Sequence, residues 1–116
     1  MDTNIIIYLL NGKLAFPLPD GQYNVSIITE IELLSFSGLS AGEEQKIEEL
    51  LLMLDRVHLT DEIRNETIRL RRKKRLKLPD AIIAASAIIN NAVLLTNDQA
   101  FSSIDDLTCE SLQLIN

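Results

Sequence analysis

Short apolar segments alternate with longer helical ones along this chain, and no other feature limits its possible folds as much. Apolar runs of this length, bounded by turn residues, predict β-strands. Parallel strands need a crossover connection of a dozen or more residues, which is usually a helix. We therefore expect an α/β fold of three layers, α/β/α, with a central parallel sheet and helices on both faces. The expected strands are Tyr23 to Val25, Arg56 to Leu59, Val93 to Thr96 and Ser111 to Ile115.

Capping residues mark the helices between these strands. Ser26, Ser40 and Thr60 stand where a side-chain oxygen can accept a hydrogen bond from the first helical turn. Pro79 suits the first turn of a further helix, which should end near Asn90. A chain of 116 residues fits one domain of ordinary size, so residues 1–116 are expected to form a single domain.

The start of the chain lacks one expected strand. A helix is predicted from Asn4 to Leu10, and only Met1 and Asp2 precede it. In a sheet whose strands alternate with helices, this helix should follow a strand. We interpret the first strand as truncated, with Met1 standing where an apolar strand residue belongs and the true start lying upstream.

Composition excludes several classes of protein. The chain has one cysteine and one histidine, which rules out an internal disulfide and zinc sites built from these residues. No apolar run approaches the roughly 18 to 20 residues of a membrane span. The opening residues MDTN show no basic region or cleavage site of a signal peptide. We therefore expect a cytoplasmic protein.

Basic residues are concentrated in one short segment. Seven of the 11 lysines and arginines lie between Arg69 and Lys77, a stretch without acids, although the net charge is −6. Such a stripe can hold a phosphate backbone. It can also be a solvated helix end, where basic side chains favour the helix dipole. Its members are Arg69, Arg71, Arg72, Lys73, Lys74, Arg75 and Lys77.

Four acidic residues, Asp2, Glu32, Asp80 and Asp98, fall at or near the carboxyl ends of the expected strands. Parallel sheets place ligands at these ends. Clustered carboxylates repel one another unless a cation neutralises them, and oxygen ligands favour Mg²⁺ or Mn²⁺ over zinc. Such a metal activates water for attack on a phosphodiester. Each aspartate also has a structural interpretation, as a helix N-cap (Asp2), a dipole partner (Asp80) or a turn residue (Asp98).

Glu32 lies in the helix IITEIELLSF, which is apolar almost all round. A carboxylate in such a helix is expected to be poorly solvated, and therefore paired or liganded. Glu30 shares the helix, and helical periodicity does not separate the two.

Four segments together resemble the PIN-domain family. Asp2-Thr3-Asn4 is similar to its opening DTN motif, and Thr29 to Leu33 is similar to its T-x-x-E-L segment, which favours Glu32 over Glu30. Leu78-Pro79-Asp80-Ala81-Ile82-Ile83-Ala84-Ala85 resembles the LPDAxIAA motif, the most specific of the four. Thr96 to Phe101 resembles the T-x-D-x-x-F segment. The segments occur in family order and span nearly the whole chain.

The resemblance implies a Mg²⁺- or Mn²⁺-dependent ribonuclease. It makes Asp2, Asp80 and Asp98 the main metal ligands and Glu32 a further ligand or water-positioning base. Asn4 and Thr96 become supporting polar residues. The basic run leads directly into the Asp80 motif, and this position favours RNA phosphate binding over a solvated helix end. The small size is similar to VapC-type toxins, which implies a cognate antitoxin and a homodimer.

Three alternatives to this interpretation exist. A phosphoacceptor receiver domain needs adjacent acids after the first strand and a late lysine, whereas Thr3 and Asn4 follow Asp2 and no lysine follows Lys77. A non-catalytic PIN domain that serves as a binding module is the second. The third is a PIN nuclease that processes cellular RNA without an antitoxin.

Overall fold

The computed structural model describes residues 1–115 and contains two pairs of parallel strands. Strand β1 (Asn24–Ser26) pairs with β2 (Asp55–Val57), and β3 (Leu94–Leu95) pairs with β4 (Cys109–Glu110). Each strand follows or precedes a helical crossover, which explains the parallel orientation.

Met1 and Asp2 lie between the two strand pairs and join them. The amine of Met1 donates a hydrogen bond to the carbonyl of Asn24 on β1 at 2.9 Å. The amide of Asp2 donates to the carbonyl of Leu95 on β3 at 3.0 Å. The spatial order is therefore β2, β1, the Met1–Asp2 segment, β3 and β4. The parallel strands of the predicted sheet are thus present as two separate pairs, and the Met1–Asp2 segment bridges them without forming a strand of its own.

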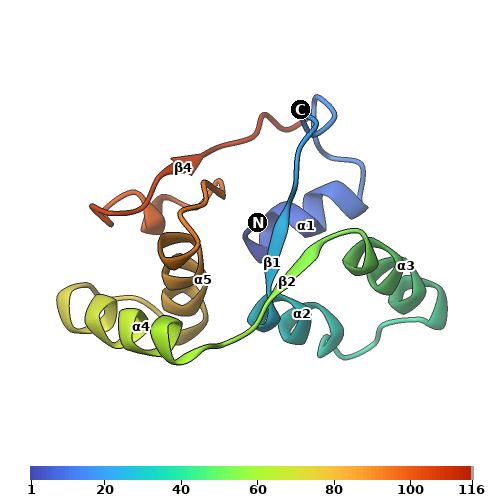
Figure 1. Cartoon of the computed structure of the whole chain (residues 1–116). Coiled ribbons are helices and arrows are strands. Elements are labelled where there is room, and N and C mark those ends of the chain that lie inside the picture. Colours follow the sequence, from blue (N-terminus) through green and yellow to red (C-terminus); the bar gives the residue numbers. More distant parts are fainter. Residues whose placement is uncertain (116) are drawn as a thin grey trace.

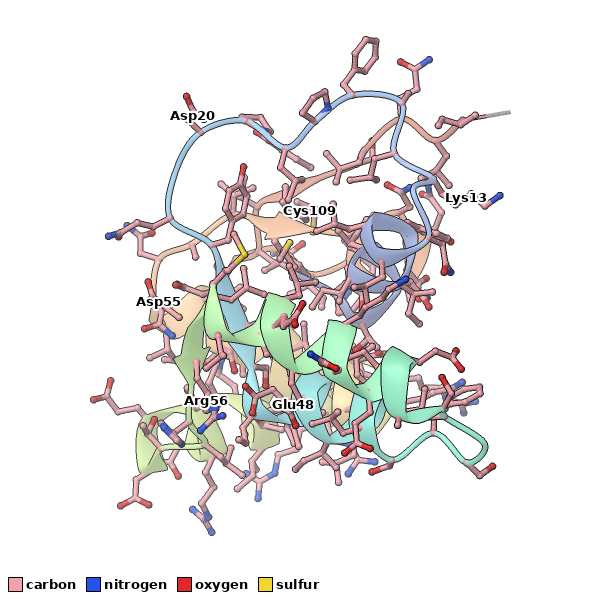
Figure 2. All side chains as sticks on the ribbon, turned by 90° about the vertical axis from the view of Figure 1, so that its right-hand side faces the viewer. Lys13, Asp20, Glu48, Asp55, Arg56 and Cys109 are labelled. Carbon is pink, nitrogen blue, oxygen red and sulfur yellow. The ribbon has the colours of Figure 1, made fainter. Side chains whose placement is uncertain are left out.

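Helices cover both sides of this sheet (Figure 1). Helices α4 (Asp61–Lys73) and α5 (Leu78–Ile89) lie on one side, together with the short 3₁₀ helix η1 (Gln99–Phe101). Helices α1 (Thr3–Leu10), α2 (Ile27–Leu34) and α3 (Ala41–Leu52) form the other side. Figure 2 shows α3 across the front of the molecule, with the exposed Glu48 on it. The three-layer α/β/α expectation is confirmed.

Two hydrophobic cores fill the space between the layers. One contains Ile6, Val25, Leu33, Ile47 and Leu51, and it joins α1, α2 and α3 to β1. The other joins α4, α5 and β3, and its largest fully buried side chain is Phe101 of η1. Ala81, Ala84 and Ala85 of α5 are wholly buried, so small side chains let this helix pack closely on its neighbours.

The predicted caps account for most helix starts. Ser40 and Glu43 form both hydrogen bonds of a capping box at the start of α3. The Ser26 side chain accepts from the amide of Ile28, and the Thr60 side chain accepts from the amide of Ile63. Helix α4 ends within the basic run, and its last turn holds Arg71, Arg72 and Lys73.

The last strand was predicted in the wrong place. Strand β4 occupies Cys109–Glu110, because the amides of Leu94 and Thr96 donate to the carbonyls of Thr108 and Glu110. The expected segment Ser111 to Ile115 instead returns to the loop after α1, where Leu114 and Leu14 form an isolated antiparallel bridge. The other expected strands are shorter than predicted or shifted by about one residue.

Within residues 1–115, none of the helices is long and apolar enough to cross a membrane.

Candidate active site

The four acids predicted as a site come from four segments that are far apart in the sequence. Asp2 precedes α1, Glu32 lies on α2, Asp80 lies in the first turn of α5, and Asp98 precedes η1. The pKa of Asp80 is raised, first by partial burial and then by the negative charges of the other three acids. The fold therefore brings Asp2, Glu32 and Asp98 within electrostatic reach of Asp80.

Thr96 connects two of these acids. Its hydroxyl donates to Oδ2 of Asp2 at 2.8 Å, and its oxygen accepts from the amide of Asp98 at 3.0 Å. Both Thr96 and Asp2 are buried. Burial raises the pKa of Asp2, while the hydrogen bond from Thr96 opposes this shift. Thr96, predicted as a supporting residue, thus fixes the relative positions of Asp2 and Asp98.

Thr3 holds the third acid. Its hydroxyl oxygen lies 2.8 Å from Oε1 of Glu32 and 3.2 Å from Oγ1 of Thr29. A hydroxyl has one proton to donate, and the ionised carboxylate has none, so Thr3 donates to Glu32 and accepts from Thr29. Thr29 is fully buried in α2. Sequence reasoning assigned no role to either threonine, although Thr3 and Thr29 both lie in the family-like motifs and Thr29 stands three positions before Glu32.

The burial argument for Glu32 was wrong. Glu32 is exposed, and the buried acid of α2 is Glu30, whose side chain is only 8% accessible. Nε of Arg56 on β2 lies 2.9 Å from Oε1 and 2.8 Å from Oε2 of Glu30. The ion pair explains how a carboxylate is accommodated on the apolar helix. It also separates the two glutamates, because Glu30 is paired with Arg56 whereas Glu32 is exposed and lies within electrostatic reach of Asp80.

Asn4, Asp2 and Asp98 agree only in part with the roles predicted for them. Asn4 is exposed, and its side chain makes no hydrogen bond within the described residues. Asp2 occupies the N-cap position of α1, but its side chain does not cap the helix. Asp98 does act as a turn residue, because its Oδ1 accepts from the amide of Ala100 at 2.9 Å. The interpretation of Asp98 as a turn residue is therefore confirmed, whereas the interpretation of the Asp2 side chain as a helix cap is wrong.

The acids are not arranged as a ready-made chelate. In the described part of the chain, no three carboxylate, imidazole or thiolate groups converge as a metal-binding cluster. The charges of Asp2, Glu32 and Asp98 act on the pKa of Asp80, but chelation needs tighter convergence than this. Asp2, Glu32 and Asp98 each accept a hydrogen bond from a protein group instead. The donor set still fits a divalent ion, because it consists of carboxylate oxygens that repel one another.

The basic run continues from the last turns of α4 to the start of α5. A shallow pocket there is lined by Ile68, Arg71, Arg72, Lys74, Arg75, Leu76 and Lys77. Lys77 is also close enough to Asp80 to lower its pKa against the other influences. Arg69 is different, because it is paired with Glu66 and, at 3.2 Å, with Asp106. The basic surface thus lies beside the acidic cluster, with Arg69 paired to acids.

Comparison with known proteins identifies the class to which this fold and site belong. The PIN domain family matches residues 1–107, and the chain belongs to this family. A toxin–antitoxin complex from Klebsiella pneumoniae contains a similar chain, with 30% identity, a TM-score of 0.76 and 92% of each chain covered. No curated protein sequence matches the chain significantly.

Two further solved structures, both VapBC complexes, resemble the chain. The structure of VapBC-1 from nontypeable Haemophilus influenzae has 26% identity and a TM-score of 0.77, and covers 95% of this chain and 94% of its own. DNA-bound VapBC from Salmonella typhimurium has 22% identity, a TM-score of 0.82 and coverage of 95% and 94%, which is a likeness of fold alone. The predicted resemblance to VapC-type PIN domains is confirmed.

Replacing Thr3 by valine tests how Glu32 is held. Valine has the same shape but no hydroxyl, so Glu32 loses its donor and the buried Thr29 loses its acceptor. We expect the rate of metal-dependent cleavage to fall about tenfold and the stability to fall by about 1 kcal/mol. Thr3→Ser keeps the hydroxyl and should restore the rate. Equal rates for the valine and serine variants in the same assay would exclude this role.

Proposed function

We propose that this chain is a Mg²⁺-dependent endoribonuclease that cleaves RNA phosphodiesters. The observation that carries the proposal is the proximity of Asp2, Glu32 and Asp98 to Asp80, whose pKa is raised first by partial burial and then by these three negative charges. Carboxylates that destabilise one another by charge are stabilised by a bound cation. The chain also offers few other catalytic groups, since His58, its one histidine, and Cys109, its one cysteine, lie outside this cluster.

Mg²⁺, or Mn²⁺ in its place, would be held by Asp2, Asp80 and Asp98, with Glu32 as a further ligand or water-positioning base. The bound metal supplies an activated water and neutralises charge that develops on the phosphodiester. The protein's own contribution is to fix these acids. Thr96 orients Asp2 and the backbone at Asp98, while Thr3 orients Glu32. Hydrogen bonds of this kind set the geometry and basicity of metal ligands.

The basic surface beside Asp80 is proposed to bind the RNA backbone. Arg71, Arg72, Lys74, Arg75 and Lys77 line one shallow depression, and Lys77 lies within electrostatic reach of Asp80. A backbone held there leads directly to the acidic cluster. Lys73 belongs to the same basic run and is included in the proposed RNA-binding residues. Arg69 contributes less, because Glu66 and Asp106 already pair with it. Binding through phosphates makes RNA affinity fall steeply with salt.

The chain is further proposed to act as the toxin of a toxin–antitoxin pair and to form a homodimer. The similar solved chains come from toxin–antitoxin complexes, and the chain covers more than nine-tenths of each of them. Co-purification with the product of an adjacent small gene tests the antitoxin. The molar mass of the purified chain in solution tests the homodimer.

Removing the metal is the direct test of the nuclease. RNA incubated with the protein and Mg²⁺ is expected to be cleaved, and excess EDTA is expected to stop the cleavage completely. Adding Mg²⁺ or Mn²⁺ beyond the chelator should restore it. A panel of structured RNAs, read on a denaturing gel, provides the substrates. Cleavage that continues unchanged in EDTA would disprove metal-dependent hydrolysis.

A further inference from the structure

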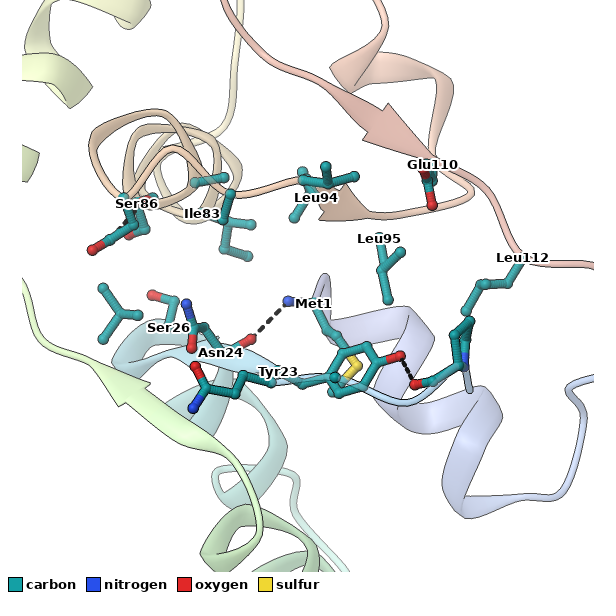
Figure 3. Close-up of a pocket in the computed structure, with 18 of the residues that line it drawn as sticks. Met1, Tyr23, Asn24, Ser26, Ile83, Ser86, Leu94, Leu95, Glu110 and Leu112 are labelled. Carbon is teal, nitrogen blue, oxygen red and sulfur yellow. Dashed lines mark hydrogen bonds between the residues drawn. The ribbon is translucent and has the colours of Figure 1, made fainter. Parts of the chain in front are cut away.

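The parallel pairing of β3 with β4 continues beyond the ends of both strands. The amide of Thr96 donates to the carbonyl of Glu110 at 3.0 Å. Two residues further on, the amide of Leu112 donates to Oδ1 of Asn97 at 2.8 Å, and Nδ2 of Asn97 donates to the carbonyl of Leu112 at 2.9 Å. Figure 3 shows Leu95, Glu110 and Leu112 at this end of the strand pair. A side chain, rather than the backbone, is thus the last pairing partner.

The two hydrogen bonds require the chemistry of an amide. A side-chain amide offers a donor and an acceptor together, as a peptide group does, so Asn97 can bind both backbone groups of Leu112. An ionised carboxylate in its place could only accept, and an aliphatic side chain could do neither. Asn97 is half-buried and fills a position that the T-x-D-x-x-F segment leaves open.

The neighbours of Asn97 on both sides belong to the candidate site. Thr96 donates to Oδ2 of Asp2 at 2.8 Å, and its hydroxyl oxygen accepts from the amide of Asp98 at 3.0 Å. Asp98 has an extended backbone, with φ −84° and ψ 120°. Successive side chains of an extended segment point to opposite sides. While Leu112 holds Asn97, the side chains of Thr96 and Asp98 are therefore kept on the other side, where Thr96 reaches Asp2.

We propose that Asn97 is a positioning residue of the candidate active site. By binding both backbone groups of Leu112, it fixes the chain between Thr96 and Asp98 and so sets the direction of the Asp98 carboxylate. Asn97 contacts neither metal nor RNA and acts only through Asp98. The inference rests on the proposed function, because the direction of Asp98 affects cleavage only if Asp98 holds the metal. Its structural half can be measured without metal or RNA.

Hydrogen exchange in the metal-free protein tests that half. Asn97→Leu has a side chain of similar size that can form neither bond, and we expect the amide of Asp98 to exchange at least about tenfold faster. The amide of Leu94, bonded to β4, is the internal reference and should change much less. Asn90→Leu is the matched control, because Asn90 also donates to a backbone carbonyl, but at the end of α5. It should leave the exchange of Asp98 unchanged.

The Mg²⁺ requirement of cleavage separates positioning from stability. At temperatures where every variant is fully folded, Asn97→Leu should need about tenfold more Mg²⁺ for half-maximal cleavage. Loss of stability alone would reduce the amount of active protein without changing this concentration. Asn90→Leu should keep the Mg²⁺ requirement of the parent.

Variants of Leu112 test the same pair from the other side. Leu112→Pro removes the amide that donates to Asn97, whereas Leu112→Ala keeps it and controls for the lost side chain. The proline variant should reproduce the faster exchange of Asp98 and the higher Mg²⁺ requirement, and the alanine variant should show neither.

An unchanged exchange rate of Asp98 in folded Asn97→Leu would overturn the proposal, and so would an unchanged Mg²⁺ requirement. If Asn97→Leu does not fold, the same two results for Leu112→Pro decide it. A parent protein that cleaves no RNA would refute the proposed nuclease instead. In that case faster exchange of Asp98 in the variant would still support the positioning role of Asn97, and unchanged exchange would still overturn it.

Discussion

Replacing Asp80 by asparagine is expected to reduce RNA cleavage at least about 100-fold and to raise the stability of the metal-free protein at neutral pH. The loss of activity follows because the amide removes one charge from the proposed metal site, and each 1.4 kcal/mol of lost transition-state stabilisation costs about tenfold. The gain in stability follows because partial burial, and then three nearby acids, disfavour the negative charge of Asp80 in the folded protein. A variant that merely damages the fold seldom lowers the cleavage rate and raises the stability at the same time.

The stability difference should depend on pH in a defined direction. The pKa of Asp80 in the folded, metal-free protein lies above its ordinary value of 3.8. Ionisation therefore destabilises the folded state relative to the unfolded chain as pH rises through the interval above 3.8. Below that interval Asp80 is protonated in both states and the variant should match the parent. The advantage of Asp80→Asn should appear as pH rises from about 4 and persist at pH 7.

Mg²⁺ should reverse the order of stability, so that the parent becomes more stable than Asp80→Asn. A ligand that binds only the folded state adds stability that grows with its concentration, so the parent should gain more than the variant as Mg²⁺ is added. Asp61→Asn is a matched control, because Asp61 also lies in the first turn of a helix but is exposed and outside the cluster. Thermal midpoints with and without Mg²⁺ give the result. Equal Mg²⁺ stabilisation of the parent and Asp80→Asn would remove Asp80 from the proposed site.

The sequence predicted the helices better than the strands, for a physical reason. Helices carry their own boundary signals, and the side chains of Ser26, Ser40 and Thr60 cap them as expected. A strand such as β4 is defined by its partner, and no local signal shows that Cys109–Glu110 pairs with β3 while the following residues turn back to the loop near Leu14.

The acids of the candidate site could be predicted because they lie in motifs with fixed spacing. The environment of these acids could not be predicted, because which glutamate of α2 is buried depends on which side of the helix meets β2. That contact places Glu30 beside Arg56 and leaves Glu32 exposed. The pairing of Arg69 with Asp106 is equally invisible in the sequence, since the two residues are 37 positions apart. The positions that sequence leaves open are those determined by tertiary contacts.

Thr96→Val is expected to have the second largest effect, because Thr96 serves two acids at once. Valine keeps the shape of the side chain but removes the donor to Asp2 and the acceptor for the amide of Asp98. Hydrogen bonds to charged groups contribute about 1.5–3 kcal/mol, and a buried unsatisfied group adds to the cost. We expect a loss of about 2–3 kcal/mol in the free energy of unfolding and a fall of about 10- to 100-fold in cleavage rate.

Thr96→Ser separates the hydroxyl from the methyl group. Serine can make both hydrogen bonds, so its cleavage rate should stay within about threefold of the parent, while the lost buried methyl group costs only about 1 kcal/mol of stability. Chemical denaturation and single-turnover cleavage at saturating Mg²⁺ give the two quantities. If the hydroxyl positions Asp2 and Asp98, the activity of the valine variant stays low even where the protein is fully folded. Full activity of the folded valine variant would show that Thr96 stabilises the fold alone.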